Sequence, residues 1–228
     1  KYLNTETALT STAPYITPDT YIWTLQNGIG NVDVIASFVK QSRVVKGLTS
    51  ATAILQAPGQ VSTNFKGETE TYYWPLAGSE HPNLAAAAET LTCAGLPTIA
   101  APDIDYRIWR KLVINATLTI IAGFNNTRIG DAYFNEPGRS LCEDVVSEVV
   151  AVAQAAGVSL ELDDALGYLN QLANSAVEHV GSTTVSLQLK QRTEVDTMNG
   201  AVVREGKKHG VPTPVNETIT KIVKKHLI

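Results

Sequence analysis

A row of polar side chains interrupts the apolar stretch YRIWRKLVINATLTIIAGFNN at residues 106–126. Lys111, Asn115 and Thr119 recur at intervals of four, which places them on one face of any helix formed here, and Arg107 continues the same row. A helix facing water would carry several charges on such a face. From Lys111 onward this row carries a single charge, and apolar residues flank it. The pattern is typical of a helix that forms the wall of a cleft.

The chemistry that this row could perform centres on Lys111. Burial disfavours the charged form of an ammonium group and lowers its pKa, so a lysine in a cleft wall can act as a general acid near neutral pH. The ordinary alternative is that Lys111 extends its charge to solvent along an apolar stem, as most helical lysines do. The uncharged neighbours favour the first interpretation.

A glycine-containing turn supplies a second candidate group. In LQNGIGN (residues 25–31), Asn27 precedes Gly28 and Gly30, after a predicted strand and before a predicted helix. A dinucleotide-binding fingerprint would need a third glycine where the chain has Asp33. We therefore interpret the segment as a turn at the C-terminal end of a sheet strand, where open α/β sheets bind ligands. Asn27 is then either a ligand contact or a structural Asn-Gly turn residue.

A third segment, QRTEVDTMNGAVVREG at residues 191–206, contains Glu194 before an apolar periodic run. A carboxylate in the first turn of a helix, favoured by the helix dipole, is a sufficient explanation for it. His179 and His209 lack metal-ligand spacing, and the chain has no HxH or HExxH motif. The sequence therefore predicts no metal site.

The elements that must position these groups fall into two parts, with a boundary near residues 101–103. Residues 1–101 have an α/β pattern, and from 102 to 228 helical periodicity dominates. We predict part of an open α/β sheet followed by an all-helical domain. The predicted strands lie at 20–26, on both sides of APGQ within 43–65, at 70–74 and within 96–102. The predicted helices are 5–12, 31–39, 81–94, 103–124, 137–157, 162–178, 188–209 and 214–227.

Composition bounds the class of protein. The chain has 228 residues, 44% of them hydrophobic, and a net charge of −4, which suits one large or two modest globular domains. The acidic balance gives no support for nucleic acid or an anionic membrane as partner. No apolar run approaches the ~20 residues that span a bilayer, and no signal peptide is visible, so we predict a cytoplasmic protein. Cys93 and Cys142 are expected to be reduced, buried thiols.

The segments TLQNGIGN, RIWRKLVINATL and RTEVDTMNGAVVREGKKHGVPTPVNET, in this order and at this separation, resemble the ketopantoate reductase (2-dehydropantoate 2-reductase) family. GLTSATAILQAPGQV resembles the family's strand pair after the crevice, and the resemblance extends over essentially the whole chain. It implies the C-terminal part of a Rossmann-type NADP-binding domain at 1–101 and a helical, 6-phosphogluconate-dehydrogenase-like domain at 102–228. It further implies NADPH-dependent reduction of ketopantoate to D-pantoate in pantothenate biosynthesis.

The resemblance also implies roles for single residues. The catalytic positions of the family match Lys111 and Glu194, and its substrate-binding positions match Asn27, Asn115, Thr119 and, counting back from Glu194 without gaps, Ser182. The cofactor-binding positions match Lys1, Asn27, Ala53 and Glu194. The implied partners are NADPH and a small 2-oxoacid, and the helical domain is compatible with a homodimer.

Two departures from the family pattern lie in the substrate pocket. Thr119 replaces a second asparagine, and STTVS at residues 182–186 replaces the usual SMLQD. They leave open an alternative function, that of a D-2-hydroxyacid dehydrogenase acting on other 2-oxoacids.

A third departure concerns the start of the chain. The family's glycine-rich loop lies upstream of the residue that matches Lys1 and is not in this sequence. We therefore expect the sequence to be part of a longer protein, and we expect these 228 residues alone to bind NADPH poorly. A catalytically incomplete fragment is the remaining alternative. The joint presence of Lys111, Asn115 and Glu194 argues against it, because a pocket without chemistry has no reason to keep a desolvated lysine.

Overall fold

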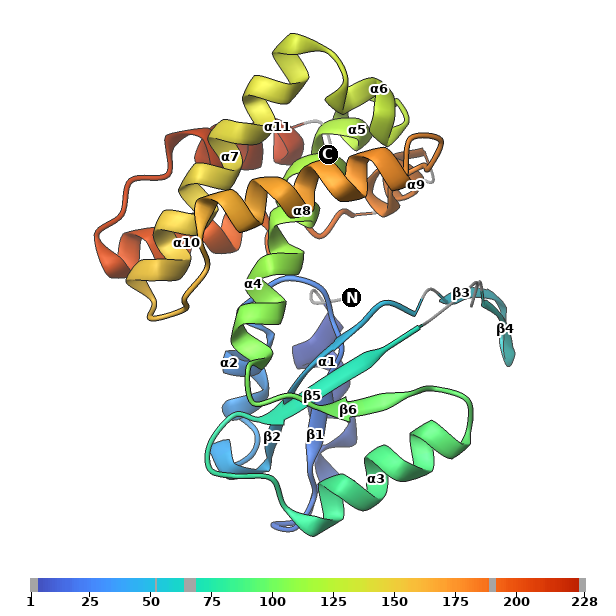
Figure 1. The fold of residues 1–228 in the computed structure, drawn as a ribbon. Helices are drawn as coiled ribbons and strands as arrows, with labels where there is room; N and C mark the ends of the chain where they lie inside the picture. The colour runs from blue at the N-terminus through green and yellow to red at the C-terminus, as the bar shows by residue number, and fades with distance from the viewer. Residues whose placement is uncertain (1–3, 52, 64–68, 189–191, 226–228) are drawn as a thin grey trace. The chain divides into compact units, whose positions relative to one another are not determined.

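The computed structural model describes residues 4–51, 53–63, 69–188 and 192–225 (Figure 1). The chain forms two compact units. Unit 1 contains the described residues up to Gln26 together with Asn31–Ile104, and unit 2 contains Asn27–Gly30 and the described residues from Asp105 onward. The turn Asn27–Gly30 therefore belongs to the helical unit by its contacts, although it lies within the α/β part of the sequence.

Unit 1 is built on a mixed sheet in which the strand order is β1-β2-β5-β6. β1 and β2 are parallel, as are β5 and β6, whereas β2 and β5 are antiparallel. The strand predicted before Asn27 is confirmed as β1. The strand bounds are β1 (Ile22–Thr24), β2 (Val44–Thr49), β5 (Thr71–Pro75) and β6 (Thr98–Ala100).

A separate hairpin follows β2. Its strands β3 (Ala53–Ala57) and β4 (Gln60–Thr63) pair antiparallel around Gly59, whose φ is +76°. The sequence predicted two strand-like runs within residues 43–65, and the structure divides this stretch into three strands, β2, β3 and β4.

Helices cover both faces of the four-stranded sheet. The adjacent residues Val44 and Val45 of β2 point to opposite faces, as successive strand residues must, and both are fully buried. On one face Val45 packs with Leu84 of α3 (Pro82–Cys93). On the other face Val44 packs with Leu9 of α1 (Thr5–Thr12) and Ile35 of α2 (Asn31–Ala36). Short 3-10 helices at Ala13–Tyr15 and Gln41–Arg43 complete unit 1.

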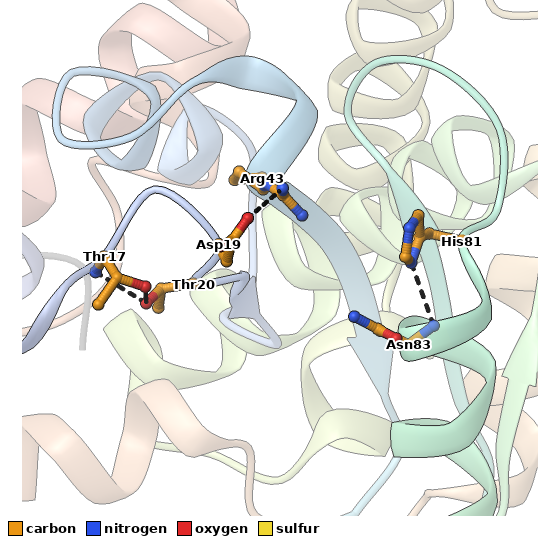
Figure 2. A network of polar contacts seen from close by, with 6 residues as sticks. All are labelled: Thr17, Asp19, Thr20, Arg43, His81 and Asn83. Atoms are coloured by element: carbon orange, nitrogen blue, oxygen red, sulfur yellow. Dashed lines mark hydrogen bonds and ion pairs between the residues drawn. The ribbon is translucent and has the colours of Figure 1, made fainter.

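Polar contacts secure the loops at the beginning of β1 and β2 (Figure 2). Arg43 donates a hydrogen bond to Asp19 Oδ1 at 2.9 Å, and the Asn83 N–H donates to His81 Nδ1 at 3.1 Å, which caps α3. This edge holds the N-terminal ends of β1 and β2 and the C-terminal ends of β5 and β6, because the two parallel pairs run in opposite directions. The contacts join the loops before β1 and β2 and cap α3, and we assign them a structural role.

Unit 2 is helical and has one large core centred on α7. Val145, Val149 and Val152 of this helix are fully buried, and α7 packs against α6, α8, α10 and α11. The bounds are α4 (Ile104–Ile114), a π-helix (Asn115–Thr119), α5 (Ile120–Asn125), α6 (Ile129–Tyr133), α7 (Glu136–Ala155), α8 (Leu162–Ser175), α9 (Ser182–Gln188), α10 (Asn199–His209) and α11 (Pro214–Lys225). None of the helices in the described ranges combines the length and apolar character needed to cross a bilayer.

Some helices begin or end at other residues than predicted, and some were not predicted. Within the predicted helix 188–209, Gln188 ends α9, residues 189–191 lie outside the described residues, and α10 begins at Asn199. The β-branched residues Thr193, Val195 and Thr197 favour other conformations, and Glu194 starts an isolated turn. The short helices α6 and α9 were not predicted. The helix predicted over 31–39 ends at Ala36. Cys142 is buried as expected, but Cys93 is exposed at the end of α3.

Candidate active site

One helical run carries the polar row, but it is not a uniform α-helix. α4 ends at Ile114, and Asn115–Thr119 continue as a π-helix before α5 begins. Threonine hydroxyls bond back to the helix here: Thr117 Oγ1 donates to the Val113 carbonyl at 2.6 Å, and Thr119 Oγ1 donates to the Asn115 carbonyl at 2.8 Å. Such bonds loosen a helix, and π segments are frequent at functional sites.

Lys111 lies in the last turn of α4 and is half-buried. Loss of solvation lowers the pKa of its ammonium group to about 8, and the nearby negative charge of Glu194 opposes this by stabilising the charged form. The expectation of a desolvated lysine in the polar row is therefore confirmed. An ammonium group with this pKa can both hold and release a proton near neutral pH.

Glu194 is held by a compact turn of its own backbone rather than by a helix. Its carbonyl oxygen accepts hydrogen bonds from the N–H groups of Thr197 and Met198 at 3.0 and 3.1 Å and from Thr197 Oγ1 at 3.0 Å. The interpretation of Glu194 as an ordinary first-turn carboxylate is wrong, because α10 begins five residues later. The turn instead brings the carboxylate within electrostatic range of Lys111.

The turn Asn27–Gly30 is seated on this same segment. The Ile29 N–H donates to the Thr197 carbonyl at 3.0 Å. Gly28 has a φ of +80°, and a Cβ at this position would lie 2.0 Å from the Thr197 oxygen, so only glycine permits the approach. The turn chemistry predicted from NGIG is confirmed, and the contact anchors Asn27 next to the Glu194 turn.

Asn115 presents a buried amide to this site. Its side chain is 8% exposed, and Nδ2 has no hydrogen-bond partner among the described residues. A buried donor without a partner is costly, and in a candidate binding site it marks a position where a ligand oxygen would be favourable. Lys111 and Asn115, one turn apart, thus offer two donors from one helical run.

The segment before α9 closes over the end of the polar row. A Cβ added to Gly181 would lie 3.4 Å from Thr119 Cβ, so the Gly181 backbone approaches Thr119 closely. Ser182, the first residue of α9, follows directly and is exposed. Sequence reasoning missed Thr184, whose hydroxyl is buried and has no partner among the described residues. Its presence in STTVS, a departure from the family pattern, was the available signal.

Two of the predicted cofactor positions lie outside the described residues of unit 2. Ala53 is exposed at the start of β3 in unit 1. Lys1 lies outside the described residues. No group of three or more histidine, cysteine, aspartate or glutamate side chains that could hold a metal ion occurs within the described part of the chain.

Comparisons with known proteins agree with the family resemblance. The family profile described as ketopantoate reductase PanE/ApbA matches residues 1–75, and the profile of its C-terminal region matches residues 103–227. A 2-dehydropantoate 2-reductase of Archaeoglobus fulgidus is 30% identical over 203 residues, which are 89% of this chain and 67% of that protein. One from Streptococcus pyogenes is 29% identical over 206 residues, 90% of this chain. The chain spans about 66% of the length of that relative.

Solved structures show the same fold. A D-mandelate dehydrogenase, solved in a ternary structure with NADH and anilino(oxo)acetate, is 26% identical to this chain and superposes on it with a TM-score of 0.91. The match covers 100% of this chain and 74% of the dehydrogenase chain. A PanE/ApbA family ketopantoate reductase from Ralstonia eutropha is 25% identical, with a TM-score of 0.86, covering 99% of this chain and 72% of its own. These similarities identify unit 1 as a Rossmann-like part and unit 2 as the helical C-terminal domain.

Proposed function

The chain belongs to the ketopantoate reductase family, and from this membership we propose that the protein reduces ketopantoate to D-pantoate with NADPH, as a step of pantothenate biosynthesis. The observation that carries the proposal is the desolvated Lys111, whose pKa is lowered to about 8 and whose ammonium group interacts electrostatically with the Glu194 carboxylate. A proton donor with a pKa near neutrality suits the reduction of a carbonyl group.

The residues of the site fit a nicotinamide cofactor. Asn27 follows β1, one of two parallel strands, at its C-terminal end, where α/β sheets bind nucleotides. Gly28 and Gly30 both have positive φ, +80° and +92°, and the seating of Gly28 on Thr197 holds Asn27 at this position. We propose Lys1, Asn27, Ala53 and Glu194 as the cofactor contacts. NADPH, when bound, supplies the hydride.

The chain's own residues manage the proton and the substrate. As the ketone carbon accepts a hydride, its oxygen gains negative charge, and the Lys111 ammonium stabilises this charge and donates a proton to that oxygen. The products are an alcohol and the oxidised cofactor, and Lys111 is reprotonated from solvent. Glu194 favours the charged form of Lys111 beforehand. We propose that Asn115 Nδ2 and the Ser182 hydroxyl hold polar groups of the substrate, with Thr119 lining the pocket.

The names of the curated relatives favour ketopantoate as substrate. The D-mandelate dehydrogenase likeness motivates including other 2-oxoacids in the assay. We propose NADPH rather than NADH as the preferred cofactor, a cytoplasmic location and a homodimer. Comparison of NADPH and NADH in one assay tests the cofactor preference. The mass in solution, measured by light scattering, tests the homodimer.

The direct test is oxidation of NADPH by the full-length protein, followed by absorbance, with ketopantoate and a set of aliphatic and aromatic 2-oxoacids. We expect turnover of ketopantoate that falls about 10²- to 10⁴-fold in Lys111→Ala, the range for loss of a general acid. Lys221→Ala is the matched control, since this exposed lysine of α11 pairs with Glu217 at 2.9 Å. Turnover of another 2-oxoacid but not ketopantoate would reassign the protein to the 2-hydroxyacid dehydrogenases. Full activity of Lys111→Ala would refute the proposed mechanism.

A further inference from the structure

A buried carboxamide binds the π-helix that follows Lys111. Asn199 is fully buried, and its Nδ2 donates a hydrogen bond to the Ala116 carbonyl at 2.9 Å. A π turn holds one residue more than an α turn and disturbs the regular pairing of carbonyls with N–H groups. The Asn199 amide supplies a donor to this irregular turn from outside the helix, across 83 positions of sequence.

The orientation of the Asn199 amide is set by a chain of hydrogen bonds that ends at a carboxylate. Asn199 Nδ2 also donates to Asn216 Oδ1 at 2.9 Å, and Asn216 Nδ2 donates to Glu148 Oε2 at 2.7 Å. A carboxylate only accepts hydrogen bonds, so Glu148 requires the NH2 group of Asn216 to face it. The oxygen of Asn216 must then face Asn199, which turns the Asn199 NH2 group toward the π-helix.

Glu148 is itself fixed in place. Its two oxygens accept hydrogen bonds from the backbone N–H groups of Val215 and Asn216, at 2.8 and 2.9 Å, in the first turn of α11. These are N–H groups that a helix leaves without partners at its N-terminus. α7, α11 and α10 are therefore connected to the π-helix through one polar chain, which we call the amide relay (Glu148, Asn216, Asn199 and the Ala116 carbonyl).

The amide relay also reaches the turn that carries Glu194. Asn199 begins α10 directly after this turn, and the Gly200 N–H donates back to the Val195 carbonyl at 2.8 Å. Asn199 thus connects the helical run of Lys111 with the turn of Glu194, and the charges of these two residues interact electrostatically. The π-helix begins four residues after Lys111, and the turn begins at Glu194, five residues before Asn199.

We propose that Asn199 is a positioning residue of the active site: it holds the Glu194 turn in register with the helical run of Lys111 and Asn115, and Glu148 and Asn216 set its orientation. The effect of Asn199 on catalysis rests on the proposed function. The hydrogen bonds by which Asn199 sets the register do not depend on that function. Removal of the Asn199 amide frees the π-helix from the turn and admits water to the Lys111 side chain. Desolvation is the larger of the two effects on Lys111, so the pKa of this ammonium group then rises toward its ordinary value.

The test measures the titration of Lys111 directly, in the full chain with isotope-labelled lysine, by following the ε-carbon resonance by NMR. Lys111→Arg identifies the signal. We expect Asn199→Ala to raise the pKa of Lys111 by about half a unit or more. Glu148→Gln, which keeps size but removes the acceptor-only carboxylate, is expected to produce a smaller shift in the same direction. If Asn199→Ala does not fold, the titration of Lys111 in Glu148→Gln still tests the proposal.

Asn135→Ala is the control, because Asn135 caps the other end of α7 by accepting a hydrogen bond from the Gly138 N–H at 2.9 Å. It is expected to lower the Tm without moving the pKa of Lys111. A Lys111 titration in Asn199→Ala and Glu148→Gln that coincides with that of the unmodified protein would overturn the proposal.

Kinetics on the same variants separates this proposal from the proposed function. We expect kcat of Asn199→Ala to fall about tenfold or more, with its pH profile shifted alongside the NMR titration and with KM less affected. A shifted Lys111 titration in a protein that reduces no 2-oxoacid would retain the positioning role and remove the enzymatic one.

Discussion

At Lys111, burial and a neighbouring carboxylate act in opposite directions on one ammonium group, and burial is the stronger. The resulting pKa of about 8 matters because a general acid works best when its pKa is near the working pH. The same burial costs folding free energy whenever the group is charged. Burial of Lys111 therefore favours activity, because it brings the pKa near the working pH, but it lowers the stability of the folded protein. Both effects can be measured.

The first prediction concerns the pH dependence of catalysis. Lys111 must be protonated to donate a proton, so kcat/KM is expected to be level below pH 8 and to fall about tenfold per unit above it, following the pKa of about 8. Steady-state kinetics between pH 6 and 10 checks this. Lys111→Arg stays charged throughout, so any residual activity of this variant should lack the fall. An identical fall in Lys111→Arg would assign the titration to another group.

The second prediction concerns stability. The folded-state pKa of Lys111, about 8, lies below the ordinary value of 10.5, so the unfolded chain binds more protons between these pH values and the stability of the unmodified protein rises with pH across that window. Lys111→Met removes the buried charge and is expected to gain about 1–3 kcal/mol at pH 7. The gain should be complete below pH 8 and vanish toward pH 10.5. Urea unfolding at pH 7 and pH 10 measures it, and a loss of stability at pH 7 would contradict it.

At the scale of elements, close packing between α5 and α9 decides where Ser182 and Thr184 lie. Gly123 in α5 makes this possible, because a Cβ there would lie 2.6 Å from Thr183 Cγ2 and 3.0 Å from the Thr184 backbone nitrogen. A shift of the α9 backbone would also displace Gly181, which directly precedes α9 and packs against Thr119.

We therefore expect Gly123→Ala to lower stability by about 1–3 kcal/mol through overpacking and to raise KM for the 2-oxoacid. Gly167→Ala is the matched control in α8, where a Cβ would meet nothing within 4 Å. Relief of glycine's conformational entropy should stabilise that variant by about 0.5–1 kcal/mol. Thermal unfolding and steady-state kinetics of both proteins decide the matter. A neutral Gly123→Ala would mean that α9 is free to shift.

At the scale of the whole molecule, the two units differ in the size of their cores. Unit 2 has one extensive core around α7, whereas unit 1 divides its buried apolar residues into two small clusters on opposite faces of one sheet. Because resistance to local opening follows buried apolar contact, the units should open with different free energies. Backbone amides of α7 are expected to exchange with deuterium about 100-fold more slowly than those of β1 and β2.

Hydrogen exchange followed by mass spectrometry measures this difference. Equal exchange in α7 and β2 without cofactor would contradict the expected difference between the cores.

Local spacing determined much of this protein. The change from α/β to helical periodicity and the turn formed by Asn27–Gly30 depend on neighbours within a few positions, and the structure has these features. The spacing of Lys111, Asn115 and Thr119 predicts a common face on a regular α-helix, whereas the structure has a π-helix from Asn115. The resemblance of three sequence segments predicted the ketopantoate reductase family. The family profile and the curated relatives confirm this prediction. The resemblance also named candidate residues such as Ala53 and Ser182, whose roles remain predictions.

Tertiary structure decided the rest, because the deciding contacts join residues far apart in the chain. The π-helix at Asn115–Thr119, the seating of Gly28 on Thr197 and the placement of Glu194 near Lys111 leave no mark in a local pattern. The amide relay from Glu148 to Ala116 is of the same kind. Spacing fixes which side chains share a helix face, but packing fixes which faces meet and which charges lose their water. The pKa of Lys111 depends on that loss, so the sequence could supply the lysine and only the fold could tune it.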